Sequence, residues 1–317
     1  MKNNTLKLSV STDSDFSNQP FYDILPEEYE TLEFQLASTD HLSKNVWFRD
    51  DQDYKVGISH IGIIALASGI PVLAFILMSN HIHLVLQCSK KEAKWFVNEL
   101  KRRYSEYLNH RYGTNDFLRR IKVDVQQVRL EDESVERSIA YTLMNSVAAN
   151  ICLAANDYPW SSAGIYFRMK PAKGIRSGDI PRRTRMKMLH SKIDIPEDTL
   201  ISEGGYILPE SFIPVKFVES VFRTPKRMKY FLDNSSKAKK RLANEDGLPS
   251  FSDQVIISAI PDLCRSLFRK RSFAELEGEE MVELIKQVRR RFSADIHQIS
   301  RVVGVEYREV SRMLESF

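Results

Sequence analysis

The sequence predicts an α+β fold that is followed by an all-α C-terminal region. Between residues 33 and 130, short runs with the period-two alternation of strands are separated by longer stretches with helical periodicity. Strands and helices in that order fit a compact α+β layer. In the region after residue 251, two short helical patterns are joined by a glycine near the C-terminus.

Turn residues and changes of period set the boundaries of the predicted elements. A polar leader at 1–30 precedes the first strand, and the first helix ends before the sequence Gly69-Ile70-Pro71. Gly113 breaks the second helix. Strands are predicted at 33–37, 72–78, 82–87 and 123–130, and helices at 51–68, 91–112 and 134–155.

Residues 61–78 contain no charged side chain, and an uncharged apolar stretch of about 18 residues raises the question of a membrane span. The turn sequence interrupts it, and the pattern then changes to that of a strand. We therefore expect a helix, a turn and a buried strand, and no membrane association.

Composition restricts the class of protein. The 317 residues are 43% hydrophobic, which is enough for ordinary cores, and the length favours more than one domain. The net charge is only +4 and the pI near 8.8, so affinity for a polyanion must come from local clusters. Cys88, Cys152 and Cys264 have no paired spacing, which indicates a reducing compartment. With no apolar leader, a cytoplasmic location is expected.

The segment Asn80-His81-Ile82-His83-Leu84-Val85-Leu86 is the first candidate for chemistry. Its alternation predicts a strand with His81 and His83 on the face opposite Ile82, Leu84 and Leu86. Neutral imidazoles about 7 Å apart along one strand are able to bind one divalent ion. Two histidines spaced in this way also occur on polar surfaces and in metal-dependent amidohydrolases. The amidohydrolases need later ligands on the strands of a barrel, which His110, His190 and His297 do not provide.

A helical stretch further along carries Tyr141 and Asn145. A spacing of four residues stacks the phenol and the carboxamide on one helix face. Two nitrogen ligands, one oxygen ligand and a hydroxyl suit phosphodiester transfer, in which a metal polarises the phosphoryl group and the tyrosine attacks phosphorus.

These segments resemble the single-tyrosine HUH transposases, which are IS200-like, and within them the branch of REP-associated tyrosine transposases. The resemblance covers roughly residues 33–167 in the expected order. It rests on Leu73-Ala74-Phe75-Ile76-Leu77-Met78-Ser79-Asn80-His81-Ile82-His83-Leu84-Val85-Leu86, on Arg102-Arg103-Tyr104, on Ile139-Ala140-Tyr141 with Asn145, and on Tyr158-Pro159-Trp160-Ser161-Ser162. Ser79 and Ser146 stand where the family usually has proline, and a family tryptophan after Gly113 is replaced by Phe117 or missing.

The resemblance implies a ferredoxin-like antiparallel sheet with packed helices, the HUH endonuclease fold. It implies Tyr141 as the catalytic nucleophile, and His81, His83 and Asn145 as ligands of Mg²⁺ or Mn²⁺. The implied activity is the cleavage and rejoining of single-stranded, hairpin or palindromic DNA through a 5′-phosphotyrosine, without ATP. The oligomeric state stays open between monomer and homodimer.

Three other tyrosines are rival nucleophiles on a basic helix: Tyr104, Tyr107 and Tyr112. None has a ligand-type residue four positions later on the same helix, so Tyr141 is preferred. The basic helix is expected either to hold DNA phosphates and stack a base, or to be a solvated charged face. Its candidate DNA-binding residues are Lys101, Arg102, Arg103 and Tyr104, with Arg119 and Arg120 shortly after it. His41 and His60 have no ligand-like spacing and are expected to be structural.

The predicted domains are a leader (1–30), a catalytic domain (31–167), a basic arm (168–200), a small helical connection (201–250) and a helical domain (251–317). The arm is basic and carries Asp179 as its one acidic residue between 168 and 192, with prolines and glycines interspersed. Its candidate DNA-binding residues are Arg182, Arg183 and Arg185.

Residues 295–315 resemble a helix-turn-helix. Ser300 lies four positions before the turn glycine Gly304, and Val305, Val310 and Met313 recur as positions that bury a second helix. Arg308 and Arg312 then face outward and are candidate DNA-binding residues, unless the pair is only a packing unit. The alternative function is therefore a sequence-specific DNA-binding regulator with a catalytically idle HUH domain.

Overall fold

The structure is a computed structural model, which describes residues 32–40, 46–114, 117–129, 133–237, 251–292 and 294–315. The predicted leader at 1–30, His41 and residues 238–250 of the predicted connection lie outside the described residues.

A four-stranded antiparallel sheet forms the centre of the molecule, with the strand order β2-β3-β1-β4. The strands are β1 (Phe34–Thr39), β2 (Val72–Leu77), β3 (Ile82–Gln87) and β4 (Val123–Val128). Each lies within two residues of its prediction. The α+β class is thus confirmed, while the ferredoxin-like description remains an expectation.

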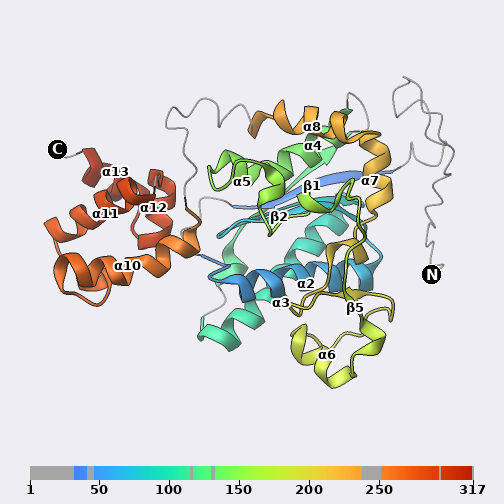
Figure 1. Ribbon diagram of the computed structural model, residues 1–317, viewed down its shortest axis with the longest axis horizontal. Coiled ribbons are helices and arrows are strands. Elements are labelled where there is room, and N and C mark those ends of the chain that lie inside the picture. The colour runs from blue at the N-terminus through green and yellow to red at the C-terminus, as the bar shows by residue number, and fades with distance from the viewer. Residues whose placement is uncertain are drawn as a thin grey trace.

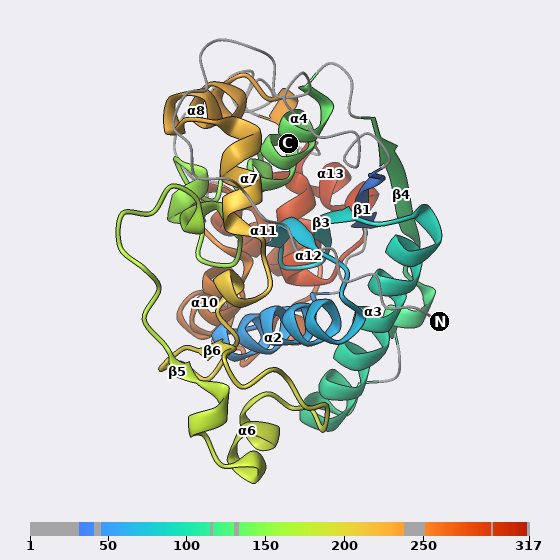
Figure 2. The same ribbon diagram turned by 90° about the vertical axis from the view of Figure 1, so that its right-hand side faces the viewer.

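Helices cover both faces of this sheet (Figures 1 and 2). On one face lie α2 (Asp51–Ser68) and α3 (Lys90–Tyr112), which contact β1, β2 and β4. On the other, α4 (Ser134–Leu143) contacts β2, β3 and β4, and α7 (Val215–Phe222) and α8 (Pro225–Asp233) pack against α4. The ring of His83 contacts that of Tyr141 on α4, so this side chain points into the layer that contains α4.

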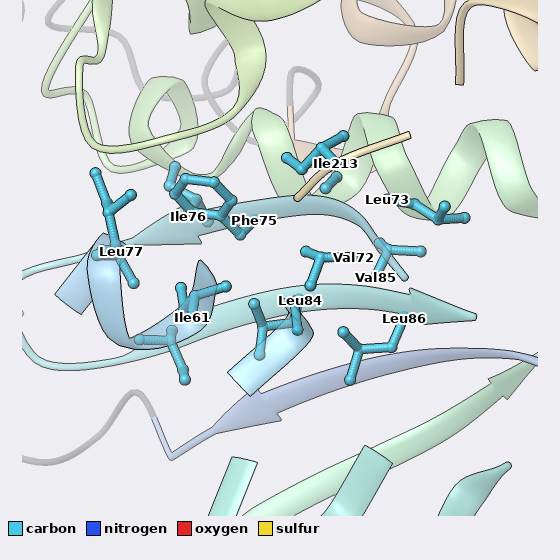
Figure 3. Close-up of a cluster of buried hydrophobic side chains, with 14 of the residues drawn as sticks. Ile61, Val72, Leu73, Phe75, Ile76, Leu77, Leu84, Val85, Leu86 and Ile213 are labelled. Atoms are coloured by element: carbon cyan, nitrogen blue, oxygen red, sulfur yellow. The ribbon is translucent and has the colours of Figure 1, made fainter. Parts of the chain in front are cut away.

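The apolar stretch that resembles a membrane span has its explanation in this packing. Its first part is the end of α2, which Gly69 terminates in the left-handed conformation with φ 71°, and its last part is β2. All six residues of β2 are buried because helices cover both of its faces. Figure 3 shows this core, with Ile213 above the strands and Ile61 of α2 below β2. Among the described residues, no helix has the length and apolar character needed to cross a membrane.

The predicted continuous helix at 134–155 is wrong. The chain instead forms α4, a break at Met144 and the short helix α5 (Asn145–Ala148). The amide nitrogen of Asn145 donates to the carbonyl oxygens of Tyr141 at 2.9 Å and Thr142 at 3.0 Å. Because this side chain bonds carbonyls at the end of α4, it acts as a local competitor of the helical ladder.

The core that includes the sheet continues well beyond residue 167. Buried side chains of α7 and α8, such as Val218 and Phe231, belong to it, and the rings of Phe34 in β1 and Phe217 stack at 6.4 Å. The predicted arm contains β5 (Ile175–Arg176), α6 (Arg182–Met188) and β6 (Leu200–Ile201), and α6 lies at the lower end of Figure 1.

Four C-terminal helices surround a second hydrophobic core: α10 (Asp253–Phe268), α11 (Glu279–Phe292), α12 (Ile296–Val303) and α13 (Tyr307–Glu315). Gly304, with φ 72°, joins the last two, and Ser300 Oγ donates to the carbonyl oxygen of Val305 at 2.6 Å. The predicted pair of helices is present, and its role in binding DNA remains a prediction.

The C-terminal unit contacts the sheet domain through the start of α10. Gln254 Nε2 donates to the carbonyl oxygen of Phe48 at 2.6 Å and to the hydroxyl of Tyr54 at 2.7 Å. Ser79 Oγ donates to the carboxylate of Asp253, which is 1% exposed. That carboxylate also accepts from Arg301 Nε of α12 at 3.0 Å.

Candidate active site

The two predicted histidines lie together at the start of β3. His83 pairs with Ser38 of β1 and Ile76 of β2, so its ring points out of the sheet toward α4. The ring centroids of His81 and His83 are 5.1 Å apart and nearly perpendicular. His83 is buried and His81 is half-buried, so this is not a solvated surface pair.

The neighbour of His81 fixes the orientation of its ring. Asn80 is 1% exposed, and its side-chain oxygen lies 2.8 Å from His81 Nδ1. An amide oxygen only accepts hydrogen bonds, so this contact places the imidazole proton on Nδ1 and leaves the lone pair on Nε2. A second partner of this kind is the usual way in which a protein orients a metal-binding histidine.

The predicted nucleophile lies beside this pair. Tyr141 is on α4, and its ring centroid is 5.8 Å from that of His83, with the two rings nearly perpendicular. The contact joins β3 to a helix that crosses the sheet, and both residues belong to one chain. His81, His83 and Tyr141 thus meet without a second subunit.

Asn145 follows Tyr141 by four residues but starts a new helix, so the prediction that both lie on one continuous helix is wrong. Its amide nitrogen is held by the carbonyls of Tyr141 and Thr142. The amide oxygen is therefore the end of this side chain that points away from those carbonyls and is able to accept a cation or a proton donor.

Two imidazoles and one amide oxygen fit a divalent ion that accepts mixed nitrogen and oxygen ligands, with Mn²⁺ better suited to such a set than Mg²⁺. Within the described part of the chain, no group of three or more His, Cys, Asp or Glu side chains is suited to a metal ion. A metal site at the histidine pair would therefore need further ligands of another kind, such as amide, water or phosphate oxygens.

The rival tyrosines form a network at the opposite face of the sheet. Asp53, which is buried, accepts hydrogen bonds from Tyr107 at 2.8 Å and Tyr112 at 3.1 Å and is paired with Arg111. Burial, together with the charge of Asp53, raises the pKa of both phenols. They are less suited than an ordinary tyrosine to act as nucleophiles.

Two predicted DNA-binding residues are in the core. Tyr104 is 1% exposed, and its hydroxyl donates to the carbonyl oxygen of Trp47 at 3.1 Å, so its ring is not available to stack on a base. Lys101 is also buried, and its ammonium donates to the carbonyl oxygen of Ile121. Desolvation by burial lowers its pKa. Both side chains have structural contacts, and the prediction that they bind DNA is not supported.

The remaining predicted DNA-binding residues are at least partly accessible, and several are engaged with carboxylates. Arg102 and Arg103 pair with Glu99 on the same helix. Arg182 and Arg185 both pair with Asp194, so the arm is less positive than its sequence indicates. Side chains exposed to solvent are Arg119, Arg120, Arg183, Arg308 and Arg312.

Sequence reasoning missed one cation close to the predicted nucleophile. Lys237 Nζ lies 4.6 Å from the centroid of the Tyr141 ring. It follows α8 in the chain, nearly a hundred residues after Tyr141, and no local pattern connects the two. A pocket of about 540 Å³ beside Tyr141 also takes part of its wall from α8, including Tyr230.

Comparison with known families gives one match. Residues 43–120 match the family model described as "Transposase IS200 like". The matched segment contains His81 and His83 and ends before Tyr141 and Asn145. Comparisons with curated proteins and with solved structures found no match.

Proposed function

We propose that the protein is an IS200-like transposase that cleaves and rejoins single-stranded DNA through a covalent bond to Tyr141. The observation that carries the proposal is the 5.8 Å contact between Tyr141 and His83, since it joins the family-matched segment to a nucleophile outside it. The family match supports a transposase in general terms, and the tyrosine mechanism is our inference.

In the proposed step, the Tyr141 oxygen attacks the scissile phosphorus and the bond from phosphorus to the 3′ oxygen breaks. The phenol loses one proton and the departing 3′ oxygen gains one, so a free 3′-hydroxyl and a 5′-phosphotyrosine result. Attack by a second 3′-hydroxyl reverses the step, and the number of phosphoester bonds stays constant. Strand transfer then needs no ATP.

The residues around Tyr141 have separable roles in this proposal. Asn80 accepts a hydrogen bond from His81 Nδ1, which leaves the lone pair of the ring on Nε2, and Asn145 fixes the end of α4 while turning its amide oxygen away from the helix. His81, His83 and Asn145 would hold Mg²⁺ or Mn²⁺, which when bound supplies charge stabilisation at the phosphoryl oxygens. Lys237 places a positive charge against the ring of the nucleophile.

The proposal is tested by trapping the covalent adduct. Purified protein is incubated with Mn²⁺ and labelled single-stranded hairpins copied from the DNA that flanks its gene. The wild type and Tyr104→Phe should form an adduct that survives denaturation, and Tyr141→Phe should form none while it still binds the hairpin. An adduct that persists in Tyr141→Phe would show that another residue is the nucleophile.

The second candidate is a DNA-binding regulator with an idle catalytic domain. It is favoured by the α12–α13 pair, which has a glycine turn and exposes Arg308 and Arg312 on the second helix. High-affinity binding to one duplex sequence, lost in Arg308→Ala, with no adduct on any hairpin, would support this function instead.

A further inference from the structure

We infer that the pocket beside Tyr141 is a subsite for one unstacked nucleotide of single-stranded DNA, with α8 as its outer wall. The inference rests on the proposed function and assigns the nucleotide next to the scissile phosphate to this pocket. Its volume of about 540 Å³ lies within the range of roughly 300–1,000 Å³ that is usual for pockets enclosing small ligands. The residues that carry the argument are His83, Gln126, Arg137, Tyr141, Tyr230 and Asn234.

Ion pairs of one arginine, one of them to a buried carboxylate, fix the outer wall. Arg227 of α8 donates to Glu133 at 2.9 Å and to Glu136 of α4 at 3.0 Å, and Glu136 is completely buried. Next to it, the rings of Phe222 and Phe231 pack at 5.8 Å inside the main core. Since breaking a buried pair is costly, α8 is held against the helix that carries the nucleophile.

Tyr230 is positioned to receive a base. Its side chain lies on the pocket wall and is 61% exposed, although the neighbouring Phe231 is buried. The two rings meet at 5.7 Å and 86°, so Phe231 supports the Tyr230 ring and leaves at least one of its faces uncovered. Exposed aromatic faces stack on any base, because every base has a π-face.

Two amides from different elements line the pocket, and a hydrogen bond orients each of them. Gln126 of β4 donates to Asp124 at 2.8 Å, and Asn234 at the end of α8 donates to the carbonyl oxygen of Tyr230 at 2.9 Å. Both side chains retain an amide oxygen for the edge of a base. Bases of single strands are commonly recognised in this way, by stacking on one face and hydrogen bonds at the edge.

Two cations lie where the phosphates of such a nucleotide would lie. Lys237 is next to the Tyr141 ring. Arg137 lies one turn earlier than Tyr141 on α4, where it pairs with Glu133 at 3.4 Å and has a side chain that is 66% exposed. A nucleotide whose base stacks on Tyr230 therefore has its phosphate near both cations and near the nucleophile.

The test measures binding in Tyr141→Phe protein, which keeps the hairpin intact. Affinity is measured for the flanking-DNA hairpin and for a series in which one base at a time is replaced by an abasic site. We expect one position to weaken binding about tenfold, as is typical for the loss of one stacked base. Adding Tyr230→Ala should lower affinity for the intact hairpin by the same factor as the abasic site does, and an abasic site at that position should then weaken binding no further. Tyr230→Phe should behave like the parent protein.

Two matched controls complete the experiment. Trp95→Ala removes another exposed aromatic side chain, on α3 at the opposite face of the sheet, and should leave the abasic profile unchanged. Lys237→Met should reduce the slope of log affinity against log salt concentration by about 1, as expected for the loss of one phosphate contact. Lys229→Met removes a lysine on α8 that is paired with Asp233 and should leave this slope unchanged.

The outcomes separate this inference from the proposed function. A position that couples to Tyr230 supports the subsite whether or not the wild type forms an adduct. Abasic profiles that are identical with and without Tyr230→Ala overturn the subsite even if the wild type does form one. An adduct at Tyr141 is the independent readout of the function itself.

Discussion

Asp253→Ala is expected to destabilise the C-terminal unit by about 3 kcal/mol. The carboxylate is 1% exposed and accepts hydrogen bonds from Arg301 Nε at 3.0 Å, Gln298 Nε2 at 2.9 Å and Ser79 Oγ. Removing one partner of a buried ion pair costs about 3–5 kcal/mol, because the other charge stays buried without compensation. The side chain of Arg301 is still 18% exposed, so water compensates part of its charge and the expected cost is the lower end of this range.

Amide hydrogen exchange of α10 and α12 in the native protein measures this effect locally, since it reports the free energy of opening of each segment. Asp262→Ala is the matched control, because Asp262 lies on the same helix and forms an exposed pair with Arg265. Exposed pairs contribute about 0–1 kcal/mol, so this variant should differ little from wild type. Asp253→Asn, which keeps the shape but not the charge, should fall between them. Opening free energies for the two alanine variants within about 1 kcal/mol of each other would refute the buried-pair argument.

Three further predictions concern the ion, pH and chain length. His83→Ala or excess chelator should abolish adduct formation, and added Mn²⁺ should restore it in the chelated wild type but not in the variant. The control His110→Ala, on the exposed end of α3, should form the adduct normally. Undiminished cleavage in excess chelator would remove the ion from the mechanism. Burial, with nearby Arg103, lowers the pKa of His60 to about 3, so the folded protein resists protonation of this side chain. The free energy of unfolding should therefore fall by about 1.4 kcal/mol per pH unit as the pH falls below about 6.5. Urea titrations of His60→Gln should show a smaller decrease. A chain that ends at residue 167 should fail to fold because it lacks α7 and α8, whereas one that ends at 250 should retain the sheet core and form the adduct. Circular dichroism measures the folding of both chains, and trapping measures adduct formation. A folded, active chain that ends at 167 would contradict the prediction.

The sheet and the histidine pair could be predicted because their signals are local. Alternation along residues 82–87 places His83 on the face opposite Leu84 and Leu86, and the register with Ser38 confirms this assignment. Residues 72–77 are apolar without alternation because both faces of β2 are buried, so their length and the preceding turn identify the strand.

The break between Tyr141 and Asn145 was not predictable from periodicity. The residues around Met144 continue a helical pattern, and the competing signal is a single asparagine, whose amide bonds carbonyls three and four residues earlier. Asparagine is able to do this wherever it follows a helical turn, but a helix end results only if the tertiary packing accepts it.

Charge and aromatic content similarly failed to distinguish surface from core on α3. Lys101 and Tyr104 read as DNA contacts because they adjoin two arginines, and both are buried by segments distant in sequence. The converse holds for Arg227, whose bond to Glu136 spans 91 positions and holds α8 against α4. Neither fact is present in a local pattern.

The position before Asn80 shows how the C-terminal unit and the histidine site are joined. Ser79 stands where the resembling family usually has proline, a residue without a hydroxyl, and its Oγ donates to Asp253 in the interior. The backbone carbonyl of Ser79 also accepts from the amides of Trp47 at 2.7 Å and Phe48 at 3.1 Å, so this turn is held from two sides. Because Asn80 follows directly and orients His81, the serine gives α10 and α12 a path of consecutive contacts to the imidazole. Ser79→Pro should therefore weaken the docking of the C-terminal unit while leaving the contact between Asn80 and His81 in place. Hydrogen exchange of α10 in this variant, compared with that in Asp253→Ala, would show whether the docking depends on the serine hydroxyl.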